Sequence, residues 1–341
     1  MSLYTVITTI QAPTECMHAL SNRLSAINGR IVVAGDTKGP NSYDLPNTIF
    51  LSYEAQLNSG YSLAKKLPTK HYARKNIAYL EAIYQGAQCI YETDDDNKPN
   101  NKWNIRNEFL TNCKSVARDK GWVNVYKYFT NELIWPRGIP LNCIRSSELL
   151  PLSDLKESQR CPIQQGLVNN SPDVDAIWRL VFDRPFYFDP DKHESIYIRP
   201  GSWCPFNTQS TWWWPIAYPL LYIPSYCSFR MCDIWKSFVA QRCLWELDMG
   251  IAFHPAEVIQ DRNEHDLTKD FEDEISGYLY NSNIKKILEN CHLHAGSEFL
   301  FENLKVCYVA LVDAGIFPND ELTLVDSWIS DCRQAMKLSK I

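Results

Sequence analysis

The chain has 341 residues, of which 45% are hydrophobic and 22% are charged, as in an ordinary soluble globular protein. This length suits one large α/β domain or two coupled domains and excludes a single small core. The formal net charge of -6 provides no basic field, so we do not expect the protein to bind nucleic acid.

Twelve cysteines raise the question of disulfides or metal sites, but no Cys-x-x-Cys motif occurs. Several of them lie inside apolar runs, where a free thiol behaves as a small buried hydrophobe. Residues 3–10 lack the basic region of a signal peptide, and no run of about 18 apolar residues could span a membrane. We therefore expect a soluble, cytoplasmic protein with reduced thiols.

Strand-like and helix-like segments alternate in the first third of the chain. Apolar residues with helical spacing precede Gly86, which ends that helix as a C-terminal glycine. The pattern predicts strands over residues 3–10, 30–34, 48–51 and 88–93, and helices over residues 13–27 and 71–86. Such alternation indicates an α/β fold, in which helices flank a mixed, mostly parallel sheet and ligands bind at the C-terminal ends of its strands.

The other two thirds of the chain are less regular. Residues 136–231 are rich in proline, aromatic residues and turns, a composition that often builds the variable half of a binding site. Elsewhere we predict a loop and helix over residues 98–120, a strand over 122–129, and helices over 232–248, 284–288, 299–311 and 324–336.

Three consecutive carboxylates, Asp94, Asp95 and Asp96, follow the fourth predicted strand. A strand that brings clustered acids to the edge of an α/β sheet can present a divalent metal to a phosphorylated ligand. Mg²⁺ and Mn²⁺ prefer carboxylate oxygen and typically share it with substrate phosphates. A solvated acidic loop would have the same composition and is the alternative.

A basic segment with Arg74 and Asn76 opens the helix that precedes this strand. If the helix packs on the sheet, its N-terminal amides and Arg74 would face phosphate on the same edge as the acids. This arrangement resembles the Arg-Asn helix and Asp-x-Asp motif of the GT-A glycosyltransferases, which are sugar-nucleotide-dependent α/β enzymes. The alternative is a basic pair on the surface.

Seven further blocks of sequence resemble the STELLO glycosyltransferase-like family. They occur in the order of that family and span roughly residues 5–275. A weaker similarity extends to the reversibly glycosylated polypeptides, which act as UDP-arabinopyranose mutases. The blocks are residues 33–38 (VAGDTK), 135–141 (WPRGIPL), 163–166 (IQQG), 172–175 (PDVD), 205–209 (PFNTQ), 229–235 (FRMCDIW) and 262–265 (RNEH).

The resemblance implies a GT-A, Rossmann-like fold of the nucleotide-diphospho-sugar transferase kind. Residues 1–135 would form its nucleotide-sugar-binding half, residues 136–275 its acceptor and catalytic half, and residues 276–341 a helical C-terminal extension. The implied ligands are Mn²⁺ or Mg²⁺, a nucleotide-sugar donor with UDP as the default nucleotide, and a hydroxyl acceptor. The helical tail leaves a homo-oligomer open.

The resemblance also assigns the metal ligands. Asp94 and Asp96 would bind a cation that bridges the donor diphosphate, with His265 as a third ligand, unless this histidine is a surface or capping residue. Two carboxylates with an imidazole suit Mn²⁺ better than Mg²⁺. Asp95 would reach the ribose or the sugar instead.

Three other polar residues of the matched blocks are binding candidates. Asp36, at the end of the second predicted strand, fits a contact to the base or ribose, or else a turn, and Lys38 belongs to the same cofactor-binding block. Arg137 lies in a Pro-Arg-Gly-x-Pro turn, where a fixed guanidinium could bind phosphate bidentately.

The acceptor side has one acid and two aromatic candidates. Asp233 begins the helix over 232–248, where GT-A enzymes often place a base that removes the acceptor hydroxyl proton; the alternative is a helix cap. Trp212 and Trp213 could stack on pyranose rings, an assignment that depends on aromatic chemistry alone, and core packing is its alternative.

We therefore expect a metal-dependent glycosyltransferase that passes a sugar from a nucleotide-sugar donor to a hydroxyl acceptor. A nucleotide-sugar mutase is the first alternative, because it needs the same donor site and no acceptor. The second is a non-catalytic protein that binds carbohydrate or nucleotide.

Overall fold

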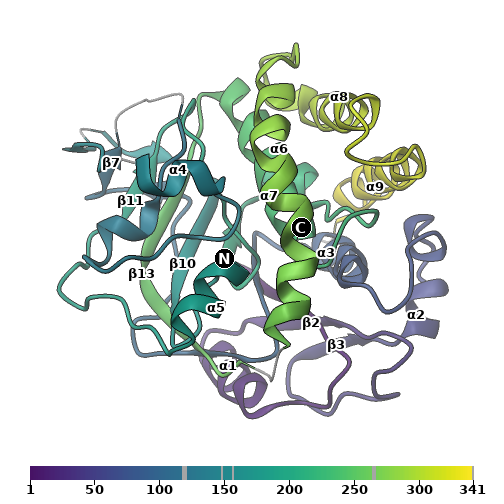
Figure 1. The fold of residues 1–341 in the computed structure, drawn as a ribbon. Helices are drawn as coiled ribbons and strands as arrows, with labels where there is room; N and C mark the ends of the chain where they lie inside the picture. The colour runs from purple at the N-terminus through teal and green to yellow at the C-terminus, as the bar shows by residue number, and fades with distance from the viewer. Residues whose placement is uncertain (117–120, 147–148, 156, 263–265, 340–341) are drawn as a thin grey trace.

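A mixed β-sheet forms the centre of the protein in the computed structural model, which describes residues 1–116, 121–146, 149–155, 157–262 and 266–339 (Figure 1). In this part of the chain the sheet has eleven strands, and β6 (Phe109–Leu110) and β9 (Gln159–Arg160) pair separately. The eleven strands are β1 (Leu3–Thr8), β2 (Arg30–Ala34), β3 (Thr48–Leu51), β4 (Cys89–Thr93), β5 (Asn97–Pro99), β7 (Lys114–Val116), β8 (Leu152–Asp154), β10 (Ile163–Asn169), β11 (Ile196–Ile198), β12 (Ser210–Trp213) and β13 (Ile251–Gln260). Their order is β3-β2-β1-β4-β12-β10-β13-β11-β7-β8, and β5 pairs with β13.

Most of these strands run in the same direction. The first four in the order are mutually parallel, and β10, β13 and β8 share their direction, whereas β5, β7, β11 and β12 run against them. The C-terminal ends of β1, β2, β4, β10 and β13 therefore meet at one edge of the sheet. The predicted α/β class with a mixed, mostly parallel sheet is confirmed, and strands from both predicted halves take part in it.

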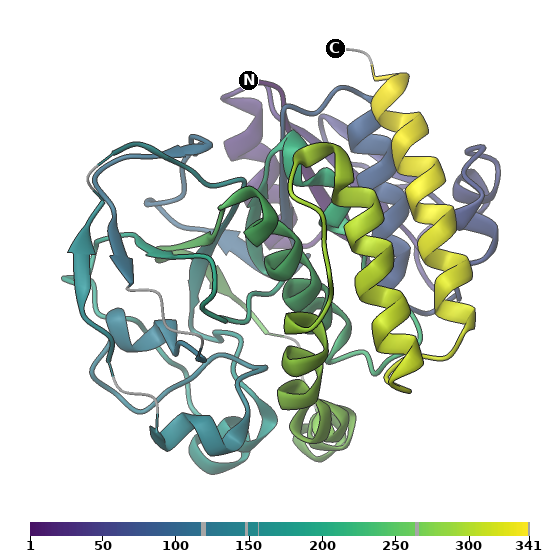
Figure 2. The same cartoon turned by 90° about the horizontal axis from the view of Figure 1, so that it is seen from above.

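Helices cover both faces of the sheet. α1 packs on one face, while α3, α6, α8 and α9 share the hydrophobic core on the other. Figure 2 shows α8 and α9 side by side, with α9 against α3. The helices are α1 (Glu15–Ser25), α2 (Tyr53–Leu57), α3 (Lys75–Tyr84), α4 (Leu141–Ser146), α5 (Ala176–Phe182), α6 (Cys232–Leu244), α7 (Leu267–Glu289), α8 (Leu300–Asp313) and α9 (Asp320–Lys337).

The predicted helices at residues 13–27, 71–86 and 232–248 and in the tail are all present, with shifted ends. The second begins as a 3-10 turn at Tyr72–Arg74 and its α-helical part ends at Tyr84. Gly86 follows the cap residue with a φ of 87°, which confirms the C-terminal glycine. The tail helices are longer than predicted, and α7 crosses the proposed boundary at residue 276. None of the helices that the structure describes is long and apolar enough to cross a membrane.

Two sequence predictions about the middle of the chain are wrong. The described part of residues 98–120 contains short strands and no helix, because this polar segment satisfies its backbone by pairing with β13, β9 and β11. Residues 122–129 contain a 3-10 helix at Val125–Tyr128 instead of a strand, since Trp122 makes only an isolated bridge to Trp203.

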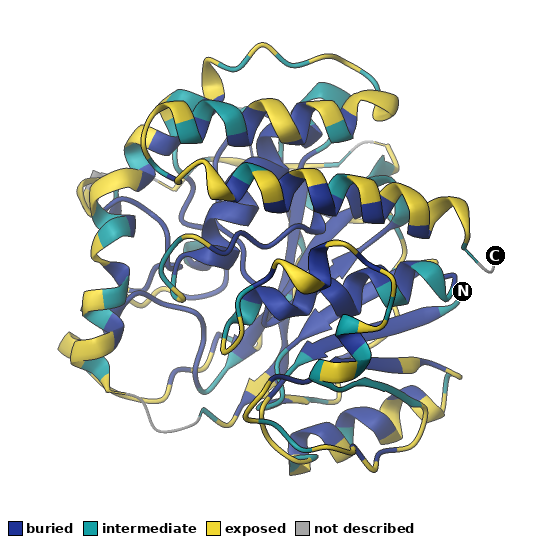
Figure 3. Ribbon diagram, turned by 90° about the vertical axis from the view of Figure 1, so that its right-hand side faces the viewer, coloured by how far each residue is buried: buried dark blue, intermediate teal, exposed yellow. Residues whose placement is uncertain are grey.

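An ion pair lies in the core between the sheet and α6. The Glu92 carboxylate of β4 accepts from Lys236 Nζ of α6 at 2.8 Å, and both side chains are buried. Figure 3 shows that the central strands of the sheet are almost entirely buried. Trp213 donates its indole N–H to the same carboxylate at 2.7 Å. Burial lowers the pKa of Lys236 despite the opposing effect of Glu92. This network fixes the start of α6 relative to β4.

We expect Lys236→Met to destabilise the protein by about 3–5 kcal/mol, because it leaves the Glu92 charge buried without its cation. Adding Glu92→Gln should recover much of that loss, since an amide is a far cheaper group to bury. Urea unfolding of both variants measures the two free energies. A single variant that costs less than about 1 kcal/mol would contradict a structural role for this pair.

Candidate active site

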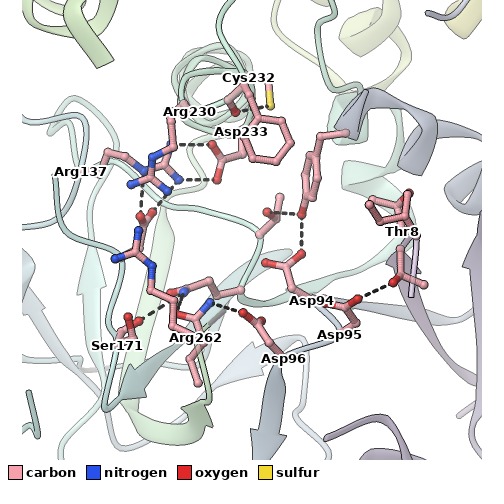
Figure 4. A pocket seen from close by; sticks show the side chains of 18 of the residues that line it. Thr8, Asp94, Asp95, Asp96, Arg137, Ser171, Arg230, Cys232, Asp233 and Arg262 are labelled. Atoms are coloured by element: carbon pink, nitrogen blue, oxygen red, sulfur yellow. Dashed lines mark hydrogen bonds and ion pairs between the residues drawn. The ribbon is translucent and has the colours of Figure 1, made fainter. Parts of the chain in front are cut away.

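A cavity of about 520 Å³ opens at the edge where the C-terminal ends of the co-directional strands meet (Figure 4). It takes residues from both halves of the chain, because the start of antiparallel β12 reaches the same edge. The N-terminal half contributes Thr8, Thr9, Asp36, Lys38, Lys70, His71, Tyr72, Asp94, Asp95 and Asp96, and the C-terminal half contributes Arg137, Ser171, Asp173, Arg179, Thr208, Gln209, Phe229, Arg230, Asp233, Gln260 and Arg262.

The acid triplet lies at the end of β4, as predicted, and neighbouring side chains hold two of its carboxylates. Asp94 Oδ1 accepts from the Tyr72 hydroxyl at 2.7 Å and from Lys75 Nζ at 3.2 Å. Lys75 is fully buried and does not line the cavity, so it positions Asp94 from within the protein core. Asp95 accepts from the Thr9 hydroxyl beside β1.

Asp96 has one oxygen without a partner. Its Oδ2 accepts from Gln260 Nε2 at 2.9 Å, but Oδ1 is buried and no described residue donates to it. Burial, followed by the charges of Asp94 and Asp95, raises the pKa of Asp96 to about 7. A buried acceptor without a donor is costly, and a bound cation would satisfy it.

The donor set fits a hard divalent cation. Asp94 and Asp96 supply carboxylate oxygens, which such ions prefer, and the buried Asp96 oxygen is unpartnered among the described residues. The third predicted ligand, His265, lies outside the described residues. Within the ranges that are described, no group of three His, Cys, Asp or Glu side chains is placed to hold a metal.

Asp36 and Lys38 both line the cavity, on the loop after β2. Asp36 accepts from the backbone N–H of Thr37 at 2.6 Å and from that of His71 at 3.1 Å. The carboxylate therefore stabilises this loop at the same time as it faces the cavity. Burial lowers the pKa of His71 in spite of the nearby Asp36, so a neutral imidazole is favoured there.

Arg137 is clamped between two buried aspartates. Its Nε and Nη2 donate to Asp173 at 2.8 and 2.9 Å, and its Nη1 and Nη2 donate to Asp233, both at 2.9 Å. Nη1 also donates to the backbone carbonyl of Arg230. The predicted bidentate contact to phosphate does not fit this geometry, because the two carboxylates occupy the fork; Arg137 instead positions Asp233.

Asp233 lines the cavity from the first turn of α6. It is the second residue of this helix, and the N-cap residue is Met231, so Asp233 is not the cap itself. Burial raises its pKa, Arg137 lowers it, and Asp173 raises it further, with a net upward direction. Burial would also raise the pKa of Asp173, but Arg137 outweighs it and the net direction is downward. Both carboxylates are counter-ions of Arg137, and Asp233 is the one that lies at the start of α6.

The structure places Arg74 and Asn76 away from the cavity, which corrects their predicted role. The Arg74 guanidinium is fully buried and donates to Gln56 Oε1 at 2.9 and 2.6 Å and to the Ala64 carbonyl at 2.9 Å. Asn76 pairs with both backbone groups of Ile223, at 2.8 and 2.9 Å. Both residues hold loops around α3 in place and have no free face for phosphate.

Trp212 and Trp213 are also fully buried and do not line the cavity, so neither forms a sugar platform. Their side chains point to opposite faces of the sheet, as alternate residues of a strand do, and both faces are covered by helices. Trp212 donates its indole N–H to Glu257 at 3.1 Å. The core-packing alternative holds for both.

Several cavity residues were missed from the sequence. The Tyr72 hydroxyl joins Asp94 to Thr208 Oγ1 at 2.6 Å, and so connects the two walls. Periodicity marks Tyr72 only as an apolar helix position. Asp173, Thr208, Arg230 and Arg262 all belong to matched sequence blocks, which was a usable signal, whereas Arg179 and Gln260 belong to none.

Comparison with known proteins supports the STELLO-like assignment. Residues 230–340 match the family model described as STELLO glycosyltransferases. Two Arabidopsis thaliana proteins, named Probable glycosyltransferase STELLO2 and Probable glycosyltransferase STELLO1, are each 26% identical to this chain over 344 residues. These alignments cover 96% of this chain but 44% of each relative, so the chain spans less than half the length of these relatives.

The family match begins at Arg230 and therefore includes Asp233 and Arg262 but not the acid triplet. Among solved structures, a chain titled Crystal Structure of a Mycobacterial Protein aligns with a TM-score of 0.38 and 9% identity, covering 83% of this chain and 75% of its own. A similarity this low carries no argument about function.

We expect Arg137→Met to destabilise the protein by about 3–5 kcal/mol at pH 8, because two buried carboxylates lose their cation. In the wild type, the lowered pKa of Asp173 means that its ion pair adds stability above its unfolded pKa of about 3.9 and loses it at lower pH. Without Arg137 both carboxylates favour protonation, so the cost of the substitution should shrink towards pH 5.

Urea unfolding between pH 5 and pH 8 measures this dependence. Arg333→Met, at a half-exposed ion pair of α9, is the matched control and should change stability little at either pH. A cost for Arg137→Met that is the same at both ends of the range would contradict the clamp.

Proposed function

We propose that this STELLO-like chain is a metal-dependent glycosyltransferase of the GT-A type, which passes a sugar from a UDP-sugar to a hydroxyl acceptor. The observation that carries the proposal is the acid triplet at the end of β4, with a buried, unpartnered oxygen of Asp96 at the cavity. The names of the two Arabidopsis relatives point to the same activity. The position at the C-terminal strand edge is where α/β sheets bind nucleotides.

The donor would bind along the N-terminal wall of the cavity. Asp36 and Lys38 would contact the nucleoside, since both lie on the loop after β2 and line the cavity. Asp94 and Asp96, with His265 as the predicted third ligand, would hold Mn²⁺ or Mg²⁺, which when bound neutralises charge on the departing diphosphate. Tyr72 and Lys75 keep Asp94 oriented by hydrogen bonds of 2.7 and 3.2 Å.

The acceptor would bind against the opposite wall, beneath the start of α6. Asp233 would take the proton from the acceptor hydroxyl as that oxygen attacks the sugar, because it lines the cavity at the start of α6 and burial raises its pKa. Arg137 and Asp173 would hold Asp233 in place. This division gives the two carboxylates of the clamp separate roles.

The metal site is tested with Asp96→Asn. We expect the wild type to bind UDP only with Mn²⁺ present, and the variant to lose at least about tenfold in affinity, because a charged oxygen ligand is replaced by an amide. Isothermal titration with and without Mn²⁺ measures both, and Asp154→Asn, an exposed carboxylate on β8, is the matched control. Equal UDP affinity in wild type and Asp96→Asn would refute the metal assignment.

The base is tested with Asp233→Asn. We expect donor affinity to stay and transfer to fall by about 10²–10⁴-fold, the usual contribution of a general base. Asp173→Asn removes the other carboxylate of the clamp and should reduce transfer much less. Transfer is measured as UDP release in the presence of an acceptor panel. Retained transfer would leave Asp233 as a structural residue, and isomerisation of the nucleotide sugar alone would identify a mutase.

A further inference from the structure

Three arginines gather on the C-terminal wall of the cavity. Arg179 comes from α5, Arg230 precedes α6, and Arg262 follows β13, and all three line the same space. Figure 4 shows Arg230 beside Asp233, and Arg262 farther from Asp233, near Ser171 and Asp96. These residues, Arg179, Arg230 and Arg262, form what we call the arginine cluster.

One arginine of the cluster has no ion-pair partner among the described residues, whereas the other two each have one. Arg230 pairs with Glu274 at 2.8 Å, and Arg262 pairs with Asp270 at 2.6 Å. Arg179 donates instead to the Ser171 hydroxyl at 2.8 Å and to the Pro172 carbonyl at 2.6 Å. No carboxylate among the described residues forms an ion pair with Arg179, although only 7% of it is exposed.

The carboxylates of the clamp bring negative charge near the cluster but do not bond to it. Asp173 and Asp233 both accept from Arg137, and among the described residues neither accepts a hydrogen bond from an arginine side chain of the cluster. Burial and the charges of Arg262 and Arg230 together lower the pKa of Arg179 to about 10, against the opposing effect of Asp173. Guanidinium groups that repel one another in a water-accessible cavity are stabilised by a bound oxyanion.

Building on the proposed function, we propose that the arginine cluster is an anion subsite for a carboxylate or phosphate group of the second substrate. The group would be carried either by the acceptor or by the transferred sugar, because two of the arginines lie beside the clamp that holds Asp233. The Arg230 carbonyl accepts from Arg137, and Arg179 donates to the carbonyl of Pro172, which precedes Asp173. The donor diphosphate has its own place at the acid triplet, and Gln260 separates the two, bonded to Asp96 at 2.9 Å. The substrate class is therefore an acidic glycan, acidic sugar or phosphorylated acceptor.

Titrations with the full chain test the subsite. The wild type saturated with Mn²⁺ and UDP should still bind inorganic phosphate. Arg179→Gln should lower the affinity for phosphate by at least about tenfold and change the affinity for UDP by less than about threefold. Arg262→Gln, from a different element, should act in the same way and serves if Arg179→Gln does not fold. Arg333→Gln removes the same charge outside the cavity and should change neither ligand.

Two sugar donors identify which substrate carries the anion. If UDP-glucuronate binds more tightly than UDP-glucose to the wild type, and Arg179→Gln abolishes the difference, the anion belongs to the transferred sugar. If the wild type binds the two donors with equal affinity while Arg179→Gln still lowers the affinity for phosphate, the anion belongs to the acceptor. Both results support the subsite and differ only in its source.

Three results would overturn the proposal. If both arginine variants keep the wild-type affinity for phosphate, or if the wild type does not bind phosphate, no subsite exists. If UDP weakens as much as phosphate, the cluster holds the donor diphosphate instead. The proposed function fails separately: a wild type that binds phosphate through Arg179 but shows no Mn²⁺-dependent UDP binding would keep the subsite and lose the metal-dependent donor site.

Discussion

The shared guanidinium of Arg137 is the contact on which the arrangement of the cavity depends. It joins the turn before α4 to the loop after β10 through Asp173, and to the start of α6 through Asp233. Hydrogen bonds to one guanidinium thereby fix the relative positions of three segments that are distant in sequence. Because loss of Arg137 would leave two carboxylates buried without their cation, the position of Asp233 depends on this one guanidinium.

The sheet explains why charges of opposite sign face each other across the cavity. Co-directional strands end at one edge, so the acids after β4 and the basic residues after β13 approach each other although about half of the chain separates them. Gln260 and Gln209 bridge the two sets with neutral amides at 2.9 Å. An uncharged bridge keeps the acids and the arginines from pairing directly, which leaves both available to ligands.

Local pattern was enough for β1 to β4, most of the helices and the acid triplet, since alternation and the position after β4 are short-range properties. It predicted none of the strands after β4 and wrongly placed one at residues 122–129. It failed for Arg74 and Trp213, because the direction of each side chain depends on distant partners. Arg74 turns towards carbonyls near Ala64, and Trp213 lies on a strand that is covered on both faces. Arg179 was missed for the same reason, since only the fold brings it beside Arg262.

Every residue of α6 is buried, and α7, α8 and the segment Pro215–Leu221 enclose it. Because this helix is packed on all sides, it cannot move without disturbing its neighbours, and we expect Asp233 to keep a fixed position. In the proposed reaction, substrates would reach Asp233 through the partly open rim, where the exposed side chains of Ile10 and Phe229 border the cavity. Because folding already sets the position of this carboxylate, the proposed base would need no rearrangement of α6 during the reaction.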